Sequence, residues 1–223
     1  MNICYIVCAL DCKLDFVPDK HDYVIGADRG YLNLLKNDID PDCVIGDFDS
    51  YTDKIKCDNV IRYPVKKDFT DSALAIEHAI SKGFRKIFVY GAIGGYLDHT
   101  IANLAILADF TQRGIDIAFV YSDQVIFGIS GSKVCFDKEA KGRVSVFSFK
   151  DKAEGVYEKG LLYELKKAIL QNNIPLGVSN EFIGKNAEIS VDKGVLLIHT
   201  AKENYINHLT KEWFGAIIFS SHN

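Results

Sequence analysis

The sequence lacks the features that would tie it to a membrane, a secretion route or nucleic acid. No apolar stretch reaches the roughly 18 residues that span a bilayer, and residues 1–10 do not combine a basic start with a cleavage site. The chain carries 26 Lys and Arg against 30 Asp and Glu, without a basic run suited to a phosphate backbone. We therefore expect a cytoplasmic protein that binds neither a membrane nor nucleic acid.

The spacing of the cysteines fits neither a disulfide framework nor a zinc site. The six cysteines form no C-x-x-C pair and stand at no zinc-finger distance from a histidine. Cys4, Cys8 and Cys12 are evenly spaced, but the first two fall in an apparent buried strand, where cysteine is typically a small core residue. We expect all six to be reduced.

The first half of the chain has the pattern of an α/β domain. Short apolar runs alternate with segments of helical periodicity, which predicts a mostly parallel sheet with helices on both faces. The expected strands are 2–10, 22–27, 42–46, 59–62, 85–91 and 115–121. The expected helices are 30–37, 70–82 and 98–113.

The pattern changes after about residue 122. Short apolar runs separated by Gly, Lys and Asp predict an all-β second domain, with one helix or loop near 163–172. The runs read QVIFGIS, SKVCFDK, GRVSVFSF, AEISV and GVLLIHT. We place an α/β domain over 1–122 and a β domain over 123–223, joined without a flexible linker.

Four acidic signatures follow expected strands or open expected helices. They read GADRG (26–30), GDFDS (46–50), KDFTD (67–71) and GAIGGYLDH (91–99). Because ligands bind outside the carboxyl ends of strands in an open α/β sheet, we expect these loops to converge on one crevice. The acids that would meet there are Asp28, Asp47, Asp49, Asp68, Asp71 and Asp98.

Such a crowd of carboxylates needs a cation. Two ionised carboxylates 4 Å apart repel by about 4 kcal/mol at an effective dielectric of about 20. Mg²⁺ suits the site because it takes one or two carboxylates together with waters and substrate phosphates. Asp47 and Asp49, two apart in an extended segment, would point the same way and could share one ion. The glycines of 91–95 would let an anion approach the backbone ahead of the next helix.

Each acid also has a structural interpretation. An aspartate after a strand is often part of an Asx-turn or a helix cap. Asp71 and Asp98 precede helical patterns, where they could be N-cap or first-turn acids. A cap needs only one acid, whereas GDFDS supplies two and four loops carry acids. We therefore favour a shared site.

The four segments, in this order, resemble the thiamin pyrophosphokinase family. Its members carry G-x-D-x-G, I-G-D-F-D-S, K-D-x-T-D and G-[AG]-x-G-G-R-x-D-H, and residues 22–104 follow that series. In the second half, PLGVSNEF (175–182) is similar to the family's G-x-S-N segment, and GVLLIHT (194–200) is similar to its closing strand.

The resemblance implies an α/β ATP-binding domain followed by a β-sandwich domain. It implies a homodimer with active sites between the α/β domain of one subunit and the β domain of the other. It also implies Mg²⁺-dependent transfer of the pyrophosphoryl group of ATP to the hydroxyl of thiamine, with release of AMP.

The same resemblance assigns roles to residues. The leading magnesium ligands would be Asp47, Asp49 and Asp71, and the catalytic acids would be Asp71, Asp49 and Asp98. Contacts to the nucleotide would come from Asp28, Arg29, Gly30, Asp68, Thr70, Gly94, Gly95 and His99. Ser179 and Asn180 would face the thiamine pyrimidine.

The sequence departs from the family at Tyr96, which replaces the arginine of the fourth motif. Arginine can clamp a phosphate with two hydrogen bonds, whereas tyrosine offers one neutral hydroxyl. The family's G-L-K-Y-P-L segment reads GLLYEL here (160–165). Phe182, Tyr163 and Trp213 could cover a thiamine ring or pack in the core. Two alternatives stay open: a pyrophosphokinase for another hydroxymethyl compound such as a pterin, and a nucleotide-binding module without turnover.

Overall fold

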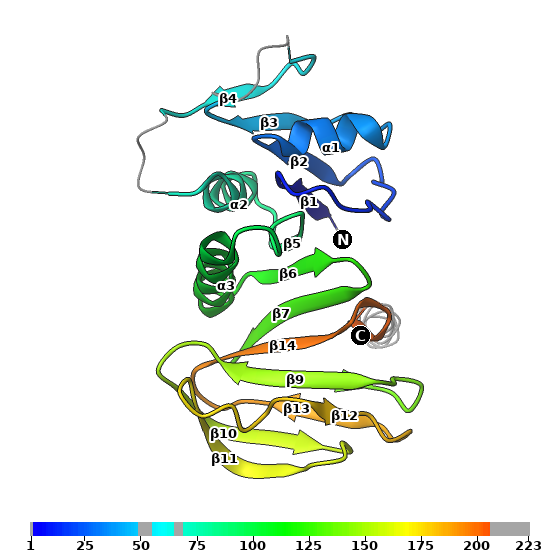
Figure 1. Cartoon of the computed structure of the whole chain (residues 1–223), viewed down its shortest axis with the longest axis vertical. Helices are drawn as coiled ribbons and strands as arrows, with labels where there is room; N and C mark the ends of the chain where they lie inside the picture. The colour runs from blue at the N-terminus through cyan, green and yellow to red at the C-terminus, as the bar shows by residue number, and fades with distance from the viewer. Residues whose placement is uncertain (1, 49–54, 65–68, 206–223) are drawn as a thin grey trace, which may run out of the picture. The chain divides into compact units, whose positions relative to one another are not determined.

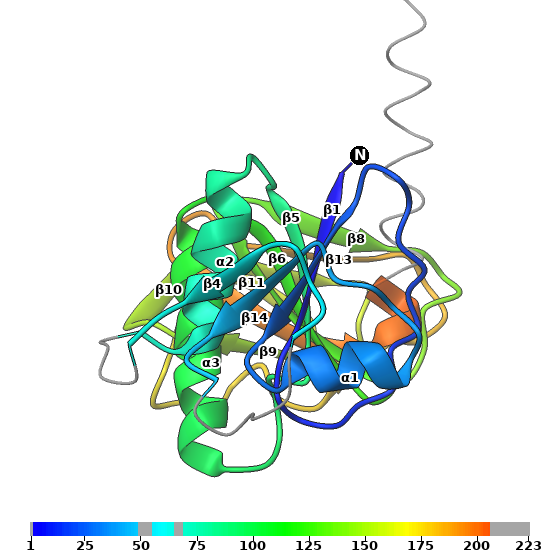
Figure 2. The ribbon, with the colours of Figure 1, turned by 90° about the horizontal axis from the view of Figure 1, so that it is seen from above.

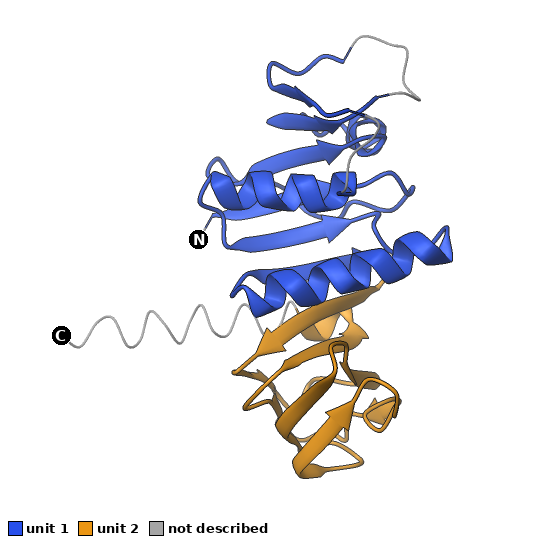
Figure 3. Cartoon of the chain, turned by 90° about the vertical axis from the view of Figure 1, so that its left-hand side faces the viewer, with its two compact units in different colours: residues 1–122 blue, residues 123–223 orange. Residues whose placement is uncertain are grey.

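Residues Met1–Ser122 and Asp123–Asn223 form separate units, which Figure 3 colours differently. The computed structural model describes residues 2–48, 55–64 and 69–205. The first unit is a parallel sheet with three helices, and the second contains two antiparallel sheets. The predicted fold class, α/β followed by all-β, is therefore confirmed.

The sheet of the first unit has the strand order β6-β5-β1-β2-β3-β4, and all its neighbouring strands are parallel. The strands are β1 (Ile3–Val7), β2 (Tyr23–Ala27), β3 (Cys43–Gly46), β4 (Val60–Arg62), β5 (Lys86–Tyr90) and β6 (Asp116–Tyr121). Ile6 of β1 lies opposite Ile25 of β2 and Val89 of β5, and all three are fully buried. These apolar runs are continuous because helices cover both faces of the sheet.

The helices are α1 (Gly30–Lys36), α2 (Asp71–Ser81) and α3 (Leu97–Gln112). Helices α2 and α3 contact each other on one face of the sheet, and α1 lies against the other face (Figure 2). Helix α2 buries Ala75, Ile76 and Ala79, as its periodicity predicts. None of the helices within the described ranges has the length and apolar character of a membrane span.

Strand β1 occupies the position that determines where a ligand can bind. The chain runs from β1 through β2 and β3 to β4, and then returns to the other side of β1 for β5 and β6 (Figure 1). A sheet whose strand order reverses in this way leaves a crevice beside the carboxyl ends of the central strands. The loops after β1, β2, β3 and β5 all open onto that edge, because parallel strands end at the same edge.

The second unit contains two antiparallel sheets. One has the order β12-β9-β14-β7 and the other β11-β10-β13-β8. Their strands are β7 (Gln124–Ser130), β8 (Lys133–Phe136), β9 (Arg143–Ser148), β10 (Lys152–Lys159), β11 (Leu165–Gln171), β12 (Asn180–Glu181), β13 (Ala187–Ser190) and β14 (Val195–Ala201). Phe136 of β8 and Phe182, directly after β12, meet edge to face at 5.0 Å between ring centroids, which joins the two sheets through their core.

The predicted helix or loop near 163–172 is wrong, because Leu165–Gln171 forms β11. This strand pairs antiparallel with β10 along the edge of its sheet. Leu165 and Ile169 are four residues apart, which looks helical, yet only Leu170 of the strand is buried. Lys167 has a φ of 52° beside a register shift, so a bulge disturbs the usual alternation. Strand β10 was not among the predicted runs.

None of the six cysteines, all of which lie within the described residues, forms a disulfide. Cys4, Cys8 and Cys43 are buried in or beside the parallel sheet, and Cys135 is exposed on β8. Burial raises the pKa of the Cys4 thiol far above its ordinary value, with Asp42 and Asp22 adding to the shift. A thiol held protonated in this way is a core residue and not a reactive group.

Candidate active site

The loops after β2 and β3 are packed directly against each other. Asp28 has a left-handed backbone, with φ of 49°, and its amide donates a 2.7 Å hydrogen bond to the carbonyl of Ile45. A Cβ placed on Gly46 would lie 3.0 Å from the Cα of Asp28. Glycine therefore lets the two backbones approach, and it brings Asp28 close to the segment that continues with Asp47.

Phe48 anchors the segment between the acids of GDFDS. Its φ of 55° is unusual for a bulky residue, and its ring is buried in a cluster with Tyr31 and Val44. The guanidinium of Arg62 lies 4.9 Å from the centroid of the ring. Strained backbone of this kind tends to occur at functional sites. Asp49, a predicted catalytic and metal-binding acid, lies outside the described residues.

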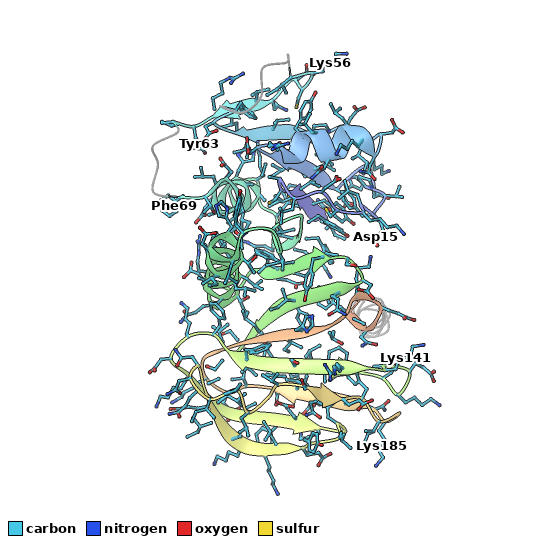
Figure 4. The ribbon with its side chains drawn as sticks, viewed as in Figure 1. Asp15, Lys56, Tyr63, Phe69, Lys141 and Lys185 are labelled. Carbon is cyan, nitrogen blue, oxygen red and sulfur yellow. The ribbon has the colours of Figure 1, made fainter. Side chains whose placement is uncertain are left out.

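At the start of α2, the threonine and not the aspartate is the cap. Thr70 is the N-cap, and its Oγ1 accepts a 3.3 Å hydrogen bond from the amide of Ala73. Asp71 follows as the first-turn acid, where the helix dipole stabilises a negative charge. Phe69, just before the cap, is 65% exposed (Figure 4). Asp68 lies outside the part of the chain that the structure describes.

Electrostatics at Cys8 links two of the acidic loops. Cys8 is buried directly after β1, at the edge where the crevice is expected. Burial is the main cause that raises the pKa of its thiol to about 12, and Cys12, Asp71 and Asp28 contribute to the same shift. Carboxylates from the loop after β2 and from the start of α2 therefore act on the same point, so the fold brings them to one edge of the sheet.

The glycine loop after β5 has the backbone shape that its sequence suggested. Gly91, Gly94 and Gly95 have φ values of 67°, 106° and 64°. A Cβ on Gly91 would lie 2.6 Å from the carbonyl oxygen of Leu10, and one on Gly95 would lie 2.7 Å from the Leu10 side chain. Leu10 packs against Gly91 and Gly95 of the loop. Gly94 and Gly95 are exposed to solvent.

The first turn of α3 is open to solvent. Asp98 is exposed, and its Oδ1 accepts a 2.9 Å hydrogen bond from the amide of His99. Tyr96, the N-cap, is 79% exposed, and its ring centroid lies 6.0 Å from that of His99. Asp98 thus fits the first-turn interpretation, and its exposed carboxylate remains accessible to a ligand. The residue that replaces the family arginine is equally accessible.

The described acids do not form a closed metal cage. Within residues 2–48, 55–64 and 69–205, no three His, Cys, Asp or Glu side chains are grouped so that they could hold a metal ion. Magnesium, however, characteristically takes only one or two carboxylates and completes its shell with waters and phosphates. Asp28 and Asp71, which both act on Cys8, fit that more modest requirement.

In the second unit, Ser179 and Asn180 differ in accessibility. Ser179 is exposed with φ of 61°, and its amide donates a 3.0 Å hydrogen bond to Oγ of Ser145. Asn180 is only 4% exposed. Its Oδ1 accepts from the amides of Tyr163 and Glu181, and its Nδ2 donates to the carbonyl of Tyr163. Ser179 can meet a ligand directly, whereas Asn180 fixes the shape of the neighbouring turn.

Asn180 also holds a buried carboxyl group that the sequence analysis missed. Its Nδ2 donates a 2.7 Å hydrogen bond to Oε2 of Glu158, which is fully buried on β10. Burial raises the pKa of Glu158 to about 7, while the hydrogen bond from Asn180 opposes the shift. Among the described residues, Oε1 of Glu158 has no hydrogen-bond partner. The only signal in the sequence is an acid two residues after Val156, on the inward side of the strand.

Exposed apolar side chains surround this part of the second unit. Tyr163 is 65% exposed, and Leu162, Leu176 and Val178 are exposed on neighbouring segments. The amide of Leu162 donates to the carbonyl of Glu181, which ties the two segments together. Phe182 is instead a core residue, and Trp213 lies outside the described residues. Of the aromatic candidates within the described ranges, Tyr163 is thus the one open to a ligand.

Comparison with known proteins matches both units to one kind of enzyme. Residues 15–119 match the family described as "Thiamin pyrophosphokinase, catalytic domain". Residues 132–196 match "Thiamin pyrophosphokinase, vitamin B1 binding domain". Together these matches describe an enzyme with a catalytic unit followed by a vitamin-binding unit. The chain belongs to the thiamin pyrophosphokinase family.

Individual relatives agree over most of the chain. The chain is similar to the thiamine pyrophosphokinase of Bacillus subtilis (strain 168), with 28% identity over 81% of this chain and 87% of the relative. It is 30% identical to a probable thiamine pyrophosphokinase from Staphylococcus saprophyticus, covering 91% of this chain and 99% of that one, with a TM-score of 0.65. A thiamin pyrophosphokinase family protein from Enterococcus faecalis shares the fold, with 24% identity over 91% and 99% of the two chains and a TM-score of 0.77.

Proposed function

We propose that this chain transfers the pyrophosphoryl group of ATP to the hydroxyl of thiamine, giving thiamine diphosphate and AMP. The observation that carries the proposal is the pairing of the two units. Acidic loops and a glycine loop open at the carboxyl edge of a sheet matched to a catalytic domain, and the following unit matches a vitamin B1 binding domain. Both substrates therefore have a candidate binding region in one chain.

The nucleotide phosphates are proposed to bind along the carboxyl edge of the parallel sheet. Gly94 and Gly95 are exposed and have no side chain, so a phosphate can approach the backbone before α3. Arg29 is exposed beside Asp28 and is the cation of this edge that we assign to phosphate. His99 and Asp98 are exposed in the first turn of α3, within reach of a ligand on the glycine loop.

We further propose that Mg²⁺ binds with the nucleotide. The residues that would hold it are Asp47 and Asp71, with Asp28 beside them and with Asp49 and Asp68 from the segments outside the described residues. Bound Mg²⁺ would supply positive charge that stabilises the phosphoryl oxygens. Mg²⁺ would take one or two of these carboxylates directly, and waters and the phosphates of ATP would complete its shell.

The chemistry asks little of a general base. Phosphoryl transfer passes through a loose transition state, so positioning and charge stabilisation account for most of the rate. The thiamine hydroxyl would attack the β-phosphorus, and AMP would leave. We assign to Asp71 the acceptance of the hydroxyl proton or a share of the metal, since α2 holds it in place at the edge of the sheet.

On the thiamine side, Ser179 is proposed to contact the pyrimidine ring and Asn180 to position it. Tyr163 can cover a ring of the cationic substrate, for which an exposed aromatic face is suitable. The fully used hydrogen bonds of Asn180 support a positioning role. A homodimer in the cytoplasm remains part of the proposal, and the exposed apolar side chains of the second unit are compatible with a partner subunit.

A product assay tests the proposal against its alternatives. Purified protein with ATP and Mg²⁺ is incubated with thiamine or with a hydroxymethylpterin, and the products are separated by chromatography. We expect thiamine diphosphate and AMP in equal amounts. Formation of ADP would contradict pyrophosphoryl transfer, and pyrophosphorylation of the pterin alone would favour the other acceptor. Nucleotide binding without any product would favour a module without turnover.

A further inference from the structure

A continuous chain of hydrogen bonds connects the start of α2 with the glycine loop. Oγ of Ser72 lies 2.8 Å from Oγ1 of Thr70 and 2.8 Å from Oδ1 of Asn103 on α3. Nδ2 of Asn103 donates a 2.7 Å hydrogen bond to the carbonyl of Ala92, directly after Gly91. Ser72 and Asn103 are 7% and 8% exposed, so water competes little for these bonds.

The direction of every bond in the chain follows from the chemistry of its members. The carbonyl of Ala92 only accepts, which fixes the orientation of the Asn103 amide and makes Oδ1 its acceptor. Ser72 must therefore donate its single hydroxyl proton to Asn103, and it must accept from the hydroxyl of Thr70. Thr70 in turn accepts from the amide of Ala73. Thr70 has no proton left to offer a phosphate.

We propose that Ser72 and Asn103 are positioning residues that hold Asp71 and the glycine loop in fixed register for pyrophosphoryl transfer. The inference rests on the proposed function. Asp71 lies in sequence between two members of the hydrogen-bond chain, the N-cap Thr70 and Ser72, and Asn103 holds Ala92, the second residue of the glycine loop. Helices α2 and α3 contact each other on one face of the sheet (Figure 1). These hydrogen bonds connect Asp71, the proposed metal-binding acid, with the backbone of the glycine loop, where we propose that phosphate binds.

Removing Ser72 from the series of hydrogen bonds has a predictable effect on both Thr70 and Asn103. Ser72→Ala removes both a donor and an acceptor, so Oδ1 of Asn103 and the hydroxyl of Thr70 lose their partners inside the protein. Thr70 can then turn outward, and the glycine loop loses part of its anchor. Reacting groups that shift by a fraction of an ångström lose rate more than affinity. We expect kcat to fall by about 10-fold, with KM for thiamine unchanged.

The test compares Ser72→Ala with Ser72→Thr, which keeps the hydroxyl, and with Thr111→Val as a matched control. Thr111 is a buried hydroxyl on α3 whose hydrogen bond to the carbonyl of Leu107 stays within the helix. Steady-state kinetics for ATP and thiamine are measured together with hydrogen exchange of the peptide covering 91–96. We expect Ser72→Ala to lower kcat and speed exchange of that peptide, while the other two variants stay close to the wild type.

Two outcomes would overturn the inference. Equal kinetics and exchange for Ser72→Ala and Thr111→Val would mean that the chain contributes only to folding. Unchanged exchange of 91–96 in Ser72→Ala would show that the loop does not depend on Ser72. A wild-type protein that makes no thiamine diphosphate would instead refute the proposed function, and the exchange measurement would still decide whether Ser72 and Asn103 position the loop.

Discussion

Asp71→Asn should lower the rate of pyrophosphoryl transfer by on the order of 100-fold or more and leave the fold intact. The carboxylate is placed at the carboxyl edge of the sheet, close enough to Cys8 to raise the pKa of that thiol. Asparagine keeps the size of the side chain but can neither balance a cation nor accept a proton at neutral pH. The measurement is kcat for thiamine diphosphate formation at saturating ATP and Mg²⁺.

The stability of Asp71→Asn should change little, because Thr70 and not Asp71 caps α2. Loss of the first-turn charge costs about 0.3–1 kcal/mol through the helix dipole. Relief of repulsion between neighbouring acids acts in the opposite direction. A variant with nearly normal activity, or one that loses several kcal/mol of unfolding free energy, would contradict a metal-binding or catalytic role.

Glu77→Gln is the matched control for that variant. Glu77 lies on the same helix, and its carboxylate accepts hydrogen bonds of 2.6 and 3.1 Å from Arg113. Both side chains are nearly half exposed, so solvent screens the pair and its loss should cost less than about 1 kcal/mol. We expect normal kcat, which separates the position of Asp71 from the general effect of removing one negative charge from α2.

The parallel sheet was predictable because its strands are short apolar runs that are buried on both faces. Val44 and Ile45 belong to such an apolar run. Both are fully buried in β3, which pairs with β4. The strand predicted over 2–10 ends at Val7, because residues 8–10 leave the sheet and are bound by a side chain from α1. The side chain of Asn33 donates to the carbonyls of Cys8 and Leu10, a contact between residues more than twenty apart. The local periodicity of the sequence cannot predict a contact between residues so far apart.

The site was predictable only as a set of loops. The glycines and acids identify the loops, and parallel topology brings them to one edge. The hydrogen-bond chain from Thr70 to Ala92 depends on how α2 and α3 pack, so sequence spacing does not reveal it. Glu158 was missed for a similar reason, because its partner Asn180 lies 22 residues away on another sheet. Strand β11 was missed because its exposed edge carries little alternation.

Glu158→Gln should remove a fall in stability that the wild-type protein shows between pH 5 and pH 8. Burial raises the pKa of Glu158 in the folded state to about 7 from its ordinary value of 4.5. Between those values the folded protein keeps a proton that the unfolded chain releases. Unfolding is therefore increasingly favoured as pH rises, until the folded carboxyl ionises as well. The stabilisation that the protonated Glu158 gives the folded protein is thus present at pH 5 and lost as the pH rises through about 7.

The expected size follows from the shift. A pKa unit corresponds to about 1.4 kcal/mol, so this carboxyl should account for about 2–3 kcal/mol of lost unfolding free energy between pH 5 and pH 8. Glutamine cannot ionise, and its oxygen can still accept from Asn180. Any constant cost of fitting its amide beside Gly177 cancels when one variant is compared at two pH values. Urea unfolding of both proteins at pH 5 and pH 8 gives the difference directly.

Glu188→Gln on β13 provides a control, because the pKa of Glu188 is shifted in the opposite direction to that of Glu158. Lys159 and Lys133 pair with Glu188 and hold its pKa below the ordinary value, so this carboxylate is ionised in both states throughout pH 5–8. Its removal should therefore shift stability equally at the two pH values. If Glu158→Gln behaves in the same way, with a curve parallel to that of the wild type, Glu158 is ionised in the folded protein. In that case an ionised carboxylate would lie buried between Leu165 and Ile189 in the register of β10, and the hydrogen bond from Asn180 would outweigh the cost of burial.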